Sequence, residues 1–181
     1  MTERTVVIFK PDAVERGLVG EILSRFEEAG LRIVGSKTVQ VDEEFVSHHY
    51  PYKEDFLRGM GLKTFQNYAE YGLDPKKELG TDDPLKIGRQ IRRWNMEFLS
   101  KGPVIAFVLE GNHAVANVRK LVGATIPSLA APGTIRGDYS TDSAIKANRE
   151  KRAIQNLVHA SGSLEEAKEE LKLWFKDREL V

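Results

Sequence analysis

Asn156-Leu157-Val158-His159-Ala160-Ser161-Gly162-Ser163 is the stretch that decides the last part of the fold, because it joins a short apolar run to a helix start. The run 155–159 predicts the final strand. Ser163 followed by Glu166 has the capping-box spacing, which predicts a helix over 163–175. The apolar positions of that helix repeat at helical intervals, at Leu164, Ala167, Leu171 and Trp174.

His159 is the chemically informative residue of this junction. It ends the strand and faces the first turn of the helix, where free backbone N–H groups and the positive end of the helix dipole favour an anion. A neutral imidazole there can attack a phosphoryl group, since the pKa of histidine lies near neutrality. The alternative is a structural histidine near a strand end, which is the commoner role of a single histidine.

Two further segments favour the chemical role. Lys10-Pro11-Asp12 follows the apolar strand pattern Thr5–Phe9, and Gly133–Asp138 is a loop punctuated by glycine. Together with Asn-x-x-His-x-Ser at Asn156, these motifs resemble the nucleoside diphosphate kinase family in order and spacing. The resemblance covers about two-thirds of the chain, over residues 3–50, 102–143 and 154–179.

The chain also departs from the family pattern. Ala160 and Gly162 stand where the family usually has glycine and aspartate, and the second change removes an acidic group near an incoming anion. Residues 51–101 replace a much shorter connection, an extra segment precedes the histidine motif, and the chain ends early. His159 and Ser161 are intact, so we expect activity to survive these changes.

The order of elements favours one fold class. Four short strand patterns and the helical patterns between them indicate a β-α-β-β-α-β arrangement with additions. The resemblance implies the same α+β, ferredoxin-like sandwich, a four-stranded antiparallel sheet with helices on one face. We expect one domain over 1–181, with 51–101 as a largely helical insertion. An irregular loop is expected over 123–138 and a short helix over 146–152.

The resemblance implies an enzyme, a nucleoside-diphosphate kinase. It would move the γ-phosphoryl group of a nucleoside triphosphate to a diphosphate by ping-pong, through a phosphohistidine on His159. Carried over by motif, the family's catalytic residues fall on His159, Glu170, Tyr50 and Ser161. Its nucleotide-binding residues fall on Lys10, Arg119, Thr125, Arg136, Asn156 and Phe98. Glu170 and Tyr50 would orient the imidazole, and Phe98 or Trp94 would contact the base.

The implied partners are nucleoside di- and triphosphates such as ATP, ADP, GTP and GDP, together with further copies of the chain in a homo-oligomer. The chain has no P-loop and no metal-ligand spacing such as H-E-x-x-H. The phosphates therefore need donors such as Lys10 and Arg136, and Mg²⁺ is expected to enter on the nucleotide phosphates.

Composition narrows the function classes. The chain has 27 basic and 27 acidic residues, which argues against nucleic acid as the main partner. There is no cysteine, so disulfides, thiolate metal sites and cysteine nucleophiles are excluded. No apolar run is long enough for a transmembrane helix, and no leader pattern is present, so we expect no membrane association and a cytoplasmic location.

Asn156 presents a geometric problem. It lies three residues before His159, and in a regular strand the two side chains would face opposite sides of the sheet. The resemblance places both at the nucleotide. That assignment requires a bend in the chain between them, or a contact from the flank.

The segment 51–101 carries an amphipathic pattern. After Pro84, apolar residues fall on one helical face, at Ile87, Ile91, Trp94 and Phe98, and basic residues fall on another, at Lys86, Arg89 and Arg93. The basic face is either ordinary solvated surface or a means of attracting a polyanionic nucleotide.

Two other function classes compete with the enzyme. One is a non-catalytic nucleotide-binding or regulatory protein on the same fold, because a fold does not fix a function. The retention of the whole set of family residues argues against it. The other is a nucleic-acid-binding module that uses the basic face of 84–98, against which the balanced charge weighs.

Overall fold

The computed structural model describes residues 2–181, which divide into two compact units. The first unit holds the chain up to Val41, then Gly102–Thr141 and Asn156–Val181. The second unit holds Asp42–Lys101 and Asp142–Gln155. All four strands belong to the first unit, whereas the second unit is helical.

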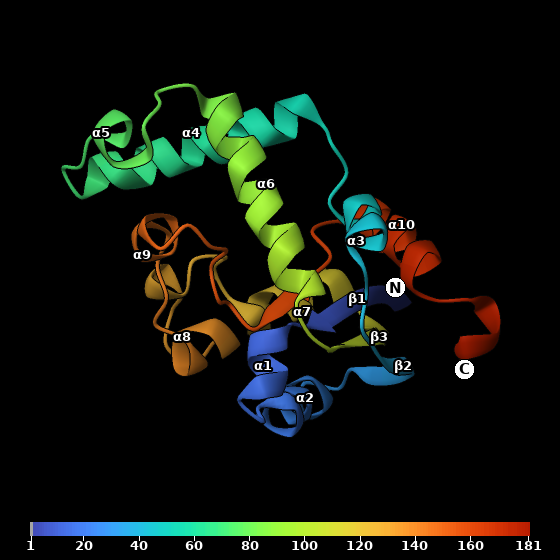
Figure 1. Cartoon of the computed structure of the whole chain (residues 1–181). Coiled ribbons are helices and arrows are strands. Elements are labelled where there is room, and N and C mark those ends of the chain that lie inside the picture. The colour runs from blue at the N-terminus through green and yellow to red at the C-terminus, as the bar shows by residue number, and fades with distance from the viewer. Residues whose placement is uncertain (1) are drawn as a thin grey trace. The chain divides into compact units, whose positions relative to one another are not determined.

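The first unit is built on an antiparallel sheet (Figure 1). Its strands are β1 (Thr2–Phe9), β2 (Arg32–Val39), β3 (Val104–Asn112) and β4 (Val158–Ala160), in the spatial order β2-β3-β1-β4. β1 pairs antiparallel with both β3 and β4, and β2 pairs antiparallel with β3. This order and the element sequence confirm the ferredoxin-like α+β fold.

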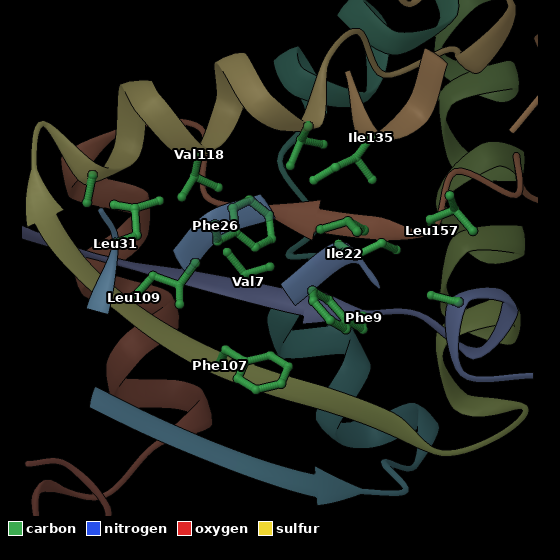
Figure 2. Packing of buried hydrophobic residues seen from close by; sticks show 14 residues of the cluster. Val7, Phe9, Ile22, Phe26, Leu31, Phe107, Leu109, Val118, Ile135 and Leu157 are labelled. Carbon is green, nitrogen blue, oxygen red and sulfur yellow. The ribbon is translucent and has the colours of Figure 1, made fainter. Parts of the chain in front are cut away.

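One face of the sheet carries the main core (Figure 2). Val7 and Phe9 of β1 pack there with Phe107 and Leu109 of β3. The helices α2 (Val19–Glu28) and α7 (Ala114–Val122), which connect the strands, contribute Ile22, Phe26, Val118 and Val122 to the same cluster. These two connecting helices lie on one face, as expected for this fold.

The opposite face of the sheet is apolar as well. Val6 and Ile8 of β1 and Ala106 and Val108 of β3 alternate with the core residues and are fully buried. Helix α10 (Leu164–Trp174), which follows β4, contacts β1 on this side and buries Trp174. A sheet with two apolar faces needs cover on both, so α10 adds a layer to the single layer of helices that was expected.

The second unit contains five helices: α3 (Glu43–His49), α4 (Glu54–Glu70), α5 (Pro75–Leu79), α6 (Pro84–Ser100) and α9 (Ala144–Arg149). The expected helical character of 51–101 is confirmed. Asp42 caps α3 by accepting from the N–H of Phe45 at 2.8 Å. Asp83 caps α6.

Two glycines let α4 and α6 approach closely. A Cβ on Gly61 would lie 1.9 Å from the carbonyl oxygen of Pro84, and one on Gly88 would lie 1.9 Å from that of Leu57. Helix α4 was not predicted. Its signal was the helical spacing of the positions that are now buried: Leu57, Gly61, Thr64 and Tyr68.

Several boundaries differ from those expected. The segment 123–138 is not wholly irregular, because it contains the 3-10 helix η1 (Pro127–Leu129) and most of α8 (Ile135–Tyr139), whose first turn is capped by Thr134. The last strand begins at Val158 instead of residue 155. The short helices α1 (Pro11–Glu15) and η2 (Asp177–Glu179) complete the first unit. Among the described residues, no helix combines the length and apolarity needed to cross a membrane.

Candidate active site

His159 projects from β4 toward helix α10. Its neighbours Val158 and Ala160 pack on the main core, so the alternation of the strand turns His159 to the opposite face. There its Nε2 lies 2.6 Å from Oε1 of Glu170. The expected pairing of these two residues is present, and it links the last strand to the last helix.

Glu170 is itself held by Ser161. The Ser161 hydroxyl donates to Oε2 of Glu170 at 2.7 Å and accepts from the N–H of Val6 at 3.2 Å. Both Ser161 and Glu170 are buried. The carboxylate is therefore fixed on both oxygens, and it fixes the imidazole in turn.

This arrangement determines the protonation of the imidazole. Burial is the largest cause that lowers the pKa of His159, and the nearby charges of Lys10, Arg136 and Arg119 lower it further. The ring is therefore neutral at pH 7. An ionised carboxylate can only accept, so we assign the proton to Nε2; the lone pair then lies on Nδ1, which is the nitrogen able to attack an electrophile.

Lys10 and Asn156 form a second part of the site. Lys10 lies directly after β1 and is buried, and its Nζ donates to Oδ1 of Asn156 at 2.8 Å. The amide of Asn156 donates to the carbonyl oxygen of Thr125 at 2.8 Å. The predicted residues Lys10, Asn156 and Thr125 thus lie together, although Thr125 makes this contact through its backbone and its side chain is exposed.

A bend before β4 explains how Asn156 can reach the site although a regular strand would turn it away from His159. Leu157 has φ +68°, and the N–H of Val158 donates to the carbonyl of Asn156 at 2.7 Å, which closes a three-residue turn. As a result the adjacent residues Leu157 and Val158 both enter the core, which a regular strand would not allow. The required bend is present, and it frees Asn156 to contact Lys10.

Arg136 of α8 holds the same turn from the other side. It is buried, and its guanidinium donates to three backbone carbonyls: those of Asn156 at 3.1 Å, Gly123 at 3.0 Å and Val158. Arg136 was predicted as a phosphate ligand, and its role in positioning the backbone was missed. Arg119, near the end of α7, is exposed and acts on His159 through its charge.

The acidic group expected to be missing at Gly162 is supplied by Glu166. One carboxylate oxygen of Glu166 accepts from the N–H of Gly162 at 2.6 Å, and a Cβ at Gly162 would lie 2.4 Å from it. The charge of Glu166 raises the pKa of His159, against the larger effects that lower it. Ser163 caps α10 as predicted, by accepting from the N–H of Glu166 at 3.2 Å. A carboxylate therefore remains beside the histidine motif.

Tyr50 and Phe98 belong to the second unit. The ring of Tyr50 lies 4.6 Å from that of His49, and the Nζ of Lys101 lies 4.9 Å from the ring centroid of Phe98. Both aromatic side chains are half-buried. Their roles at the imidazole and at the base stay predictions.

Asp12 is a site residue to which sequence reasoning gave no role. It is 4% exposed, and its Oδ2 accepts from the N–H of Leu157 at 3.0 Å. Burial raises the pKa of its carboxyl, and Lys10 opposes that rise. The available signal was its place in Lys10-Pro11-Asp12, directly after a buried strand.

The donor set suits an anion. Lys10, Arg119 and Arg136 supply positive charge around His159. The nearby carboxylates each accept from protein groups: Glu170 from His159 and Ser161, Glu166 from Gly162, and Asp12 from Leu157. Each of these carboxylates is therefore already engaged by a protein donor.

Known proteins with similar sequences and structures identify the family. The family model described as nucleoside diphosphate kinase matches residues 3–60 and 88–180. A nucleoside diphosphate kinase of Pyrobaculum aerophilum is 51% identical, over 99% of this chain and 98% of the relative. One from Pyrococcus furiosus is 41% identical, over 98% of this chain and 86% of the relative.

Two solved structures are similar over nearly the whole chain. The crystal structure of an NDP kinase from Pyrobaculum aerophilum has a TM-score of 0.94 at 49% identity, with 100% of both chains covered. A nucleoside-diphosphate kinase from Borrelia burgdorferi, a transition-state mimic with bound vanadate and ADP, has a TM-score of 0.79 at 36% identity. The match covers 99% of this chain and 90% of the Borrelia burgdorferi chain.

Proposed function

This chain belongs to the nucleoside diphosphate kinase family, and on that premise we propose that His159 is the residue that carries the transferred phosphoryl group. The protein is a phosphotransferase that moves the γ-phosphoryl group of a nucleoside triphosphate to a nucleoside diphosphate. The observation that carries the proposal is the 2.6 Å contact between Nε2 of His159 and Glu170, in a site lined by cations.

The proposed reaction has two symmetric steps. Nδ1 of His159 attacks the γ-phosphorus of the donor, an N–P bond forms, and the bond from phosphorus to the β,γ-bridging oxygen breaks, so the diphosphate leaves with that electron pair. The β-phosphate oxygen of a second diphosphate then attacks the phosphohistidine and regenerates the neutral imidazole. Glu170 holds Nε2–H throughout and stabilises the positive charge that the ring acquires.

The remaining residues bind and orient the nucleotide. Lys10, Arg119 and Arg136 would contact phosphate oxygens, and Lys10 with Asn156 would reach the ribose. Thr125 would contribute its exposed hydroxyl to the phosphates. Mg²⁺, bound to the substrate phosphates, would neutralise the charge on the transferred group. We extend the same proposal to Tyr50 as a partner of the imidazole and to Phe98 as the contact of the base.

The proposed substrates are the common pairs ATP with ADP and GTP with GDP, and the proposed location is the cytoplasm. Both units, residues 1–181, would act as one catalytic domain. The most direct test is incubation with ATP that is labelled in its γ-phosphate, followed by peptide mapping. An acid-labile, base-stable label on the peptide that contains His159 is expected, and ADP or GDP should remove it. A protein that binds ATP but never becomes labelled would instead be a non-catalytic nucleotide-binding protein.

We also expect the protein to form a homo-oligomer, as the family resemblance implies. Light scattering at micromolar concentration is expected to give a mass that is a multiple of the 20.4 kDa chain. A single 20.4 kDa species would contradict the expectation.

A further inference from the structure

The turn at Asn156–Val158 is held in a strained conformation. Leu157 has φ +68°, a value that residues other than glycine rarely adopt. Its side chain is fully buried in the main core, where Figure 2 labels it. A backbone of this kind persists only when the surrounding structure overdetermines it, so the groups that hold Leu157 are of functional interest.

Both backbone groups of Leu157 are held by the segment that follows β1. Asp12 accepts from the N–H of Leu157 at 3.0 Å, and the N–H of Lys10 donates to the carbonyl of Leu157 at 2.8 Å. Asp12 is almost fully buried, and its other oxygen, Oδ1, has no hydrogen-bond partner within residues 2–181. The backbone N–H groups of Leu157, Ala13 and Asp12 all favour the charged form of this carboxyl, and only that of Leu157 comes from a distant part of the chain.

We propose that Asp12 is a positioning residue, whose carboxylate holds Leu157 in the turn that brings Asn156 to Lys10. The inference rests on the proposed function, because it assigns a role within that site. Asn156 directly precedes Leu157, so the bend places the Asn156 side chain, which bonds to Lys10 and to the Thr125 carbonyl.

The charges around Lys10 give the proposal a second readout. Burial is the largest cause that lowers the pKa of Lys10 to about 8, and Arg136 also lowers it, whereas Asp12 raises it. His159 also faces Lys10 and is neutral at pH 7. Removal of the Asp12 charge therefore lowers the pKa of Lys10 further, and the ammonium group is lost at a lower pH.

Two substitutions separate the hydrogen bond from the charge. Asp12→Asn keeps an oxygen that can accept from Leu157 but removes the charge, and Asp12→Ala removes both. Near neutral pH, Asp12→Ala is expected to lower kcat/KM for nucleotides at least about ten-fold, mainly through KM, since a charge-assisted bond to the backbone is lost. Asp12→Asn is expected to recover most of that loss. In Asp12→Asn, the alkaline limb of kcat/KM against pH should move to lower pH.

Asp138→Asn is the matched control. Asp138 is also a carboxylate on a backbone N–H, that of Gly133 at 2.7 Å, and it pairs with Arg25, but it does not act on Lys10. This variant should lose thermal stability without moving the alkaline limb. If Asp12→Asn also leaves the alkaline limb of kcat/KM unmoved, or if Asp12→Ala keeps the wild-type KM, the proposal is wrong. Labelling of His159 in the wild-type protein tests the proposed function separately, whatever the result at Asp12.

A comparison at Leu157 tests the turn without any assay of activity. Leu157→Ala and Leu157→Gly remove the same buried contacts and differ mainly in backbone preference. Glycine normally costs stability relative to alanine, but at positive φ it relieves strain. Leu157→Gly is therefore expected to have the higher Tm of the two, with a wider gap in the Asp12→Ala background. A lower Tm for Leu157→Gly in both backgrounds would show that no strained turn is being held.

Discussion

Replacing His159 with alanine is expected to lower phosphoryl transfer by about a thousand-fold or more, because the variant lacks the nitrogen that receives the phosphoryl group. Nucleotide binding is expected to change little, since Lys10, Asn156 and Arg136 keep their contacts with one another and with the backbone. The measurement is steady-state transfer from ATP to GDP, with the Kd for ADP determined by calorimetry.

His48→Ala is the control for this experiment. His48 is exposed on α3, and its Nδ1 lies 2.9 Å from the carbonyl oxygen of Glu44 in the same helix. That variant should keep normal turnover and normal labelling by γ-labelled ATP. Near-normal turnover in His159→Ala would mean that another group accepts the phosphoryl group or that transfer is direct, and either result contradicts the mechanism.

Arg136→Lys is expected to cost both stability and activity, although the charge is kept. The guanidinium donates through three nitrogens to the carbonyls of Asn156, Gly123 and Val158, and one ammonium nitrogen cannot reach all three. Loss of such bonds in a buried site is expected to destabilise the fold by roughly 3 kcal/mol. The turn before β4 should loosen, so kcat/KM is expected to fall at least about ten-fold.

Thermal unfolding and steady-state kinetics of the same preparation measure the two effects. Arg119→Lys is the comparison, because Arg119 is exposed and the substitution keeps its charge. It should leave Tm almost unchanged and affect only nucleotide binding. If Arg136→Lys matched the wild type in both Tm and kinetics, Arg136 would be neither a support for the turn nor a specific phosphate ligand.

Much of the fold follows from local patterns in the sequence. The apolar run of β1, the helix after Pro84 and the Ser163 cap of α10 all lie where periodicity and capping predicted them. These features depend on neighbours within a few residues, which is why a single sequence reveals them.

Only part of the candidate site could be predicted from local sequence patterns. The motifs indicated His159, Lys10, Asn156 and Arg136 as a group, and the structure brings them together in the first unit. The roles of Asp12 and Glu166 were missed. Asp12 accepts from the N–H of Leu157, and Glu166 accepts from the N–H of Gly162. The type of a side chain does not reveal which backbone group it will contact.

By itself, the sequence determined the strands, most of the helices and the chemical identity of the groups at the end of β4. Only the tertiary structure decided how those groups face one another. A regular strand would turn Asn156 away from His159, and nothing local to residues 155–159 favours a left-handed leucine. The bend exists because Leu157 is buried in the core while Asp12, 145 positions away, and Arg136 hold the backbone around it. A conformation stabilised by such distant bonds has no local sequence pattern, so it becomes visible only after the chain has folded.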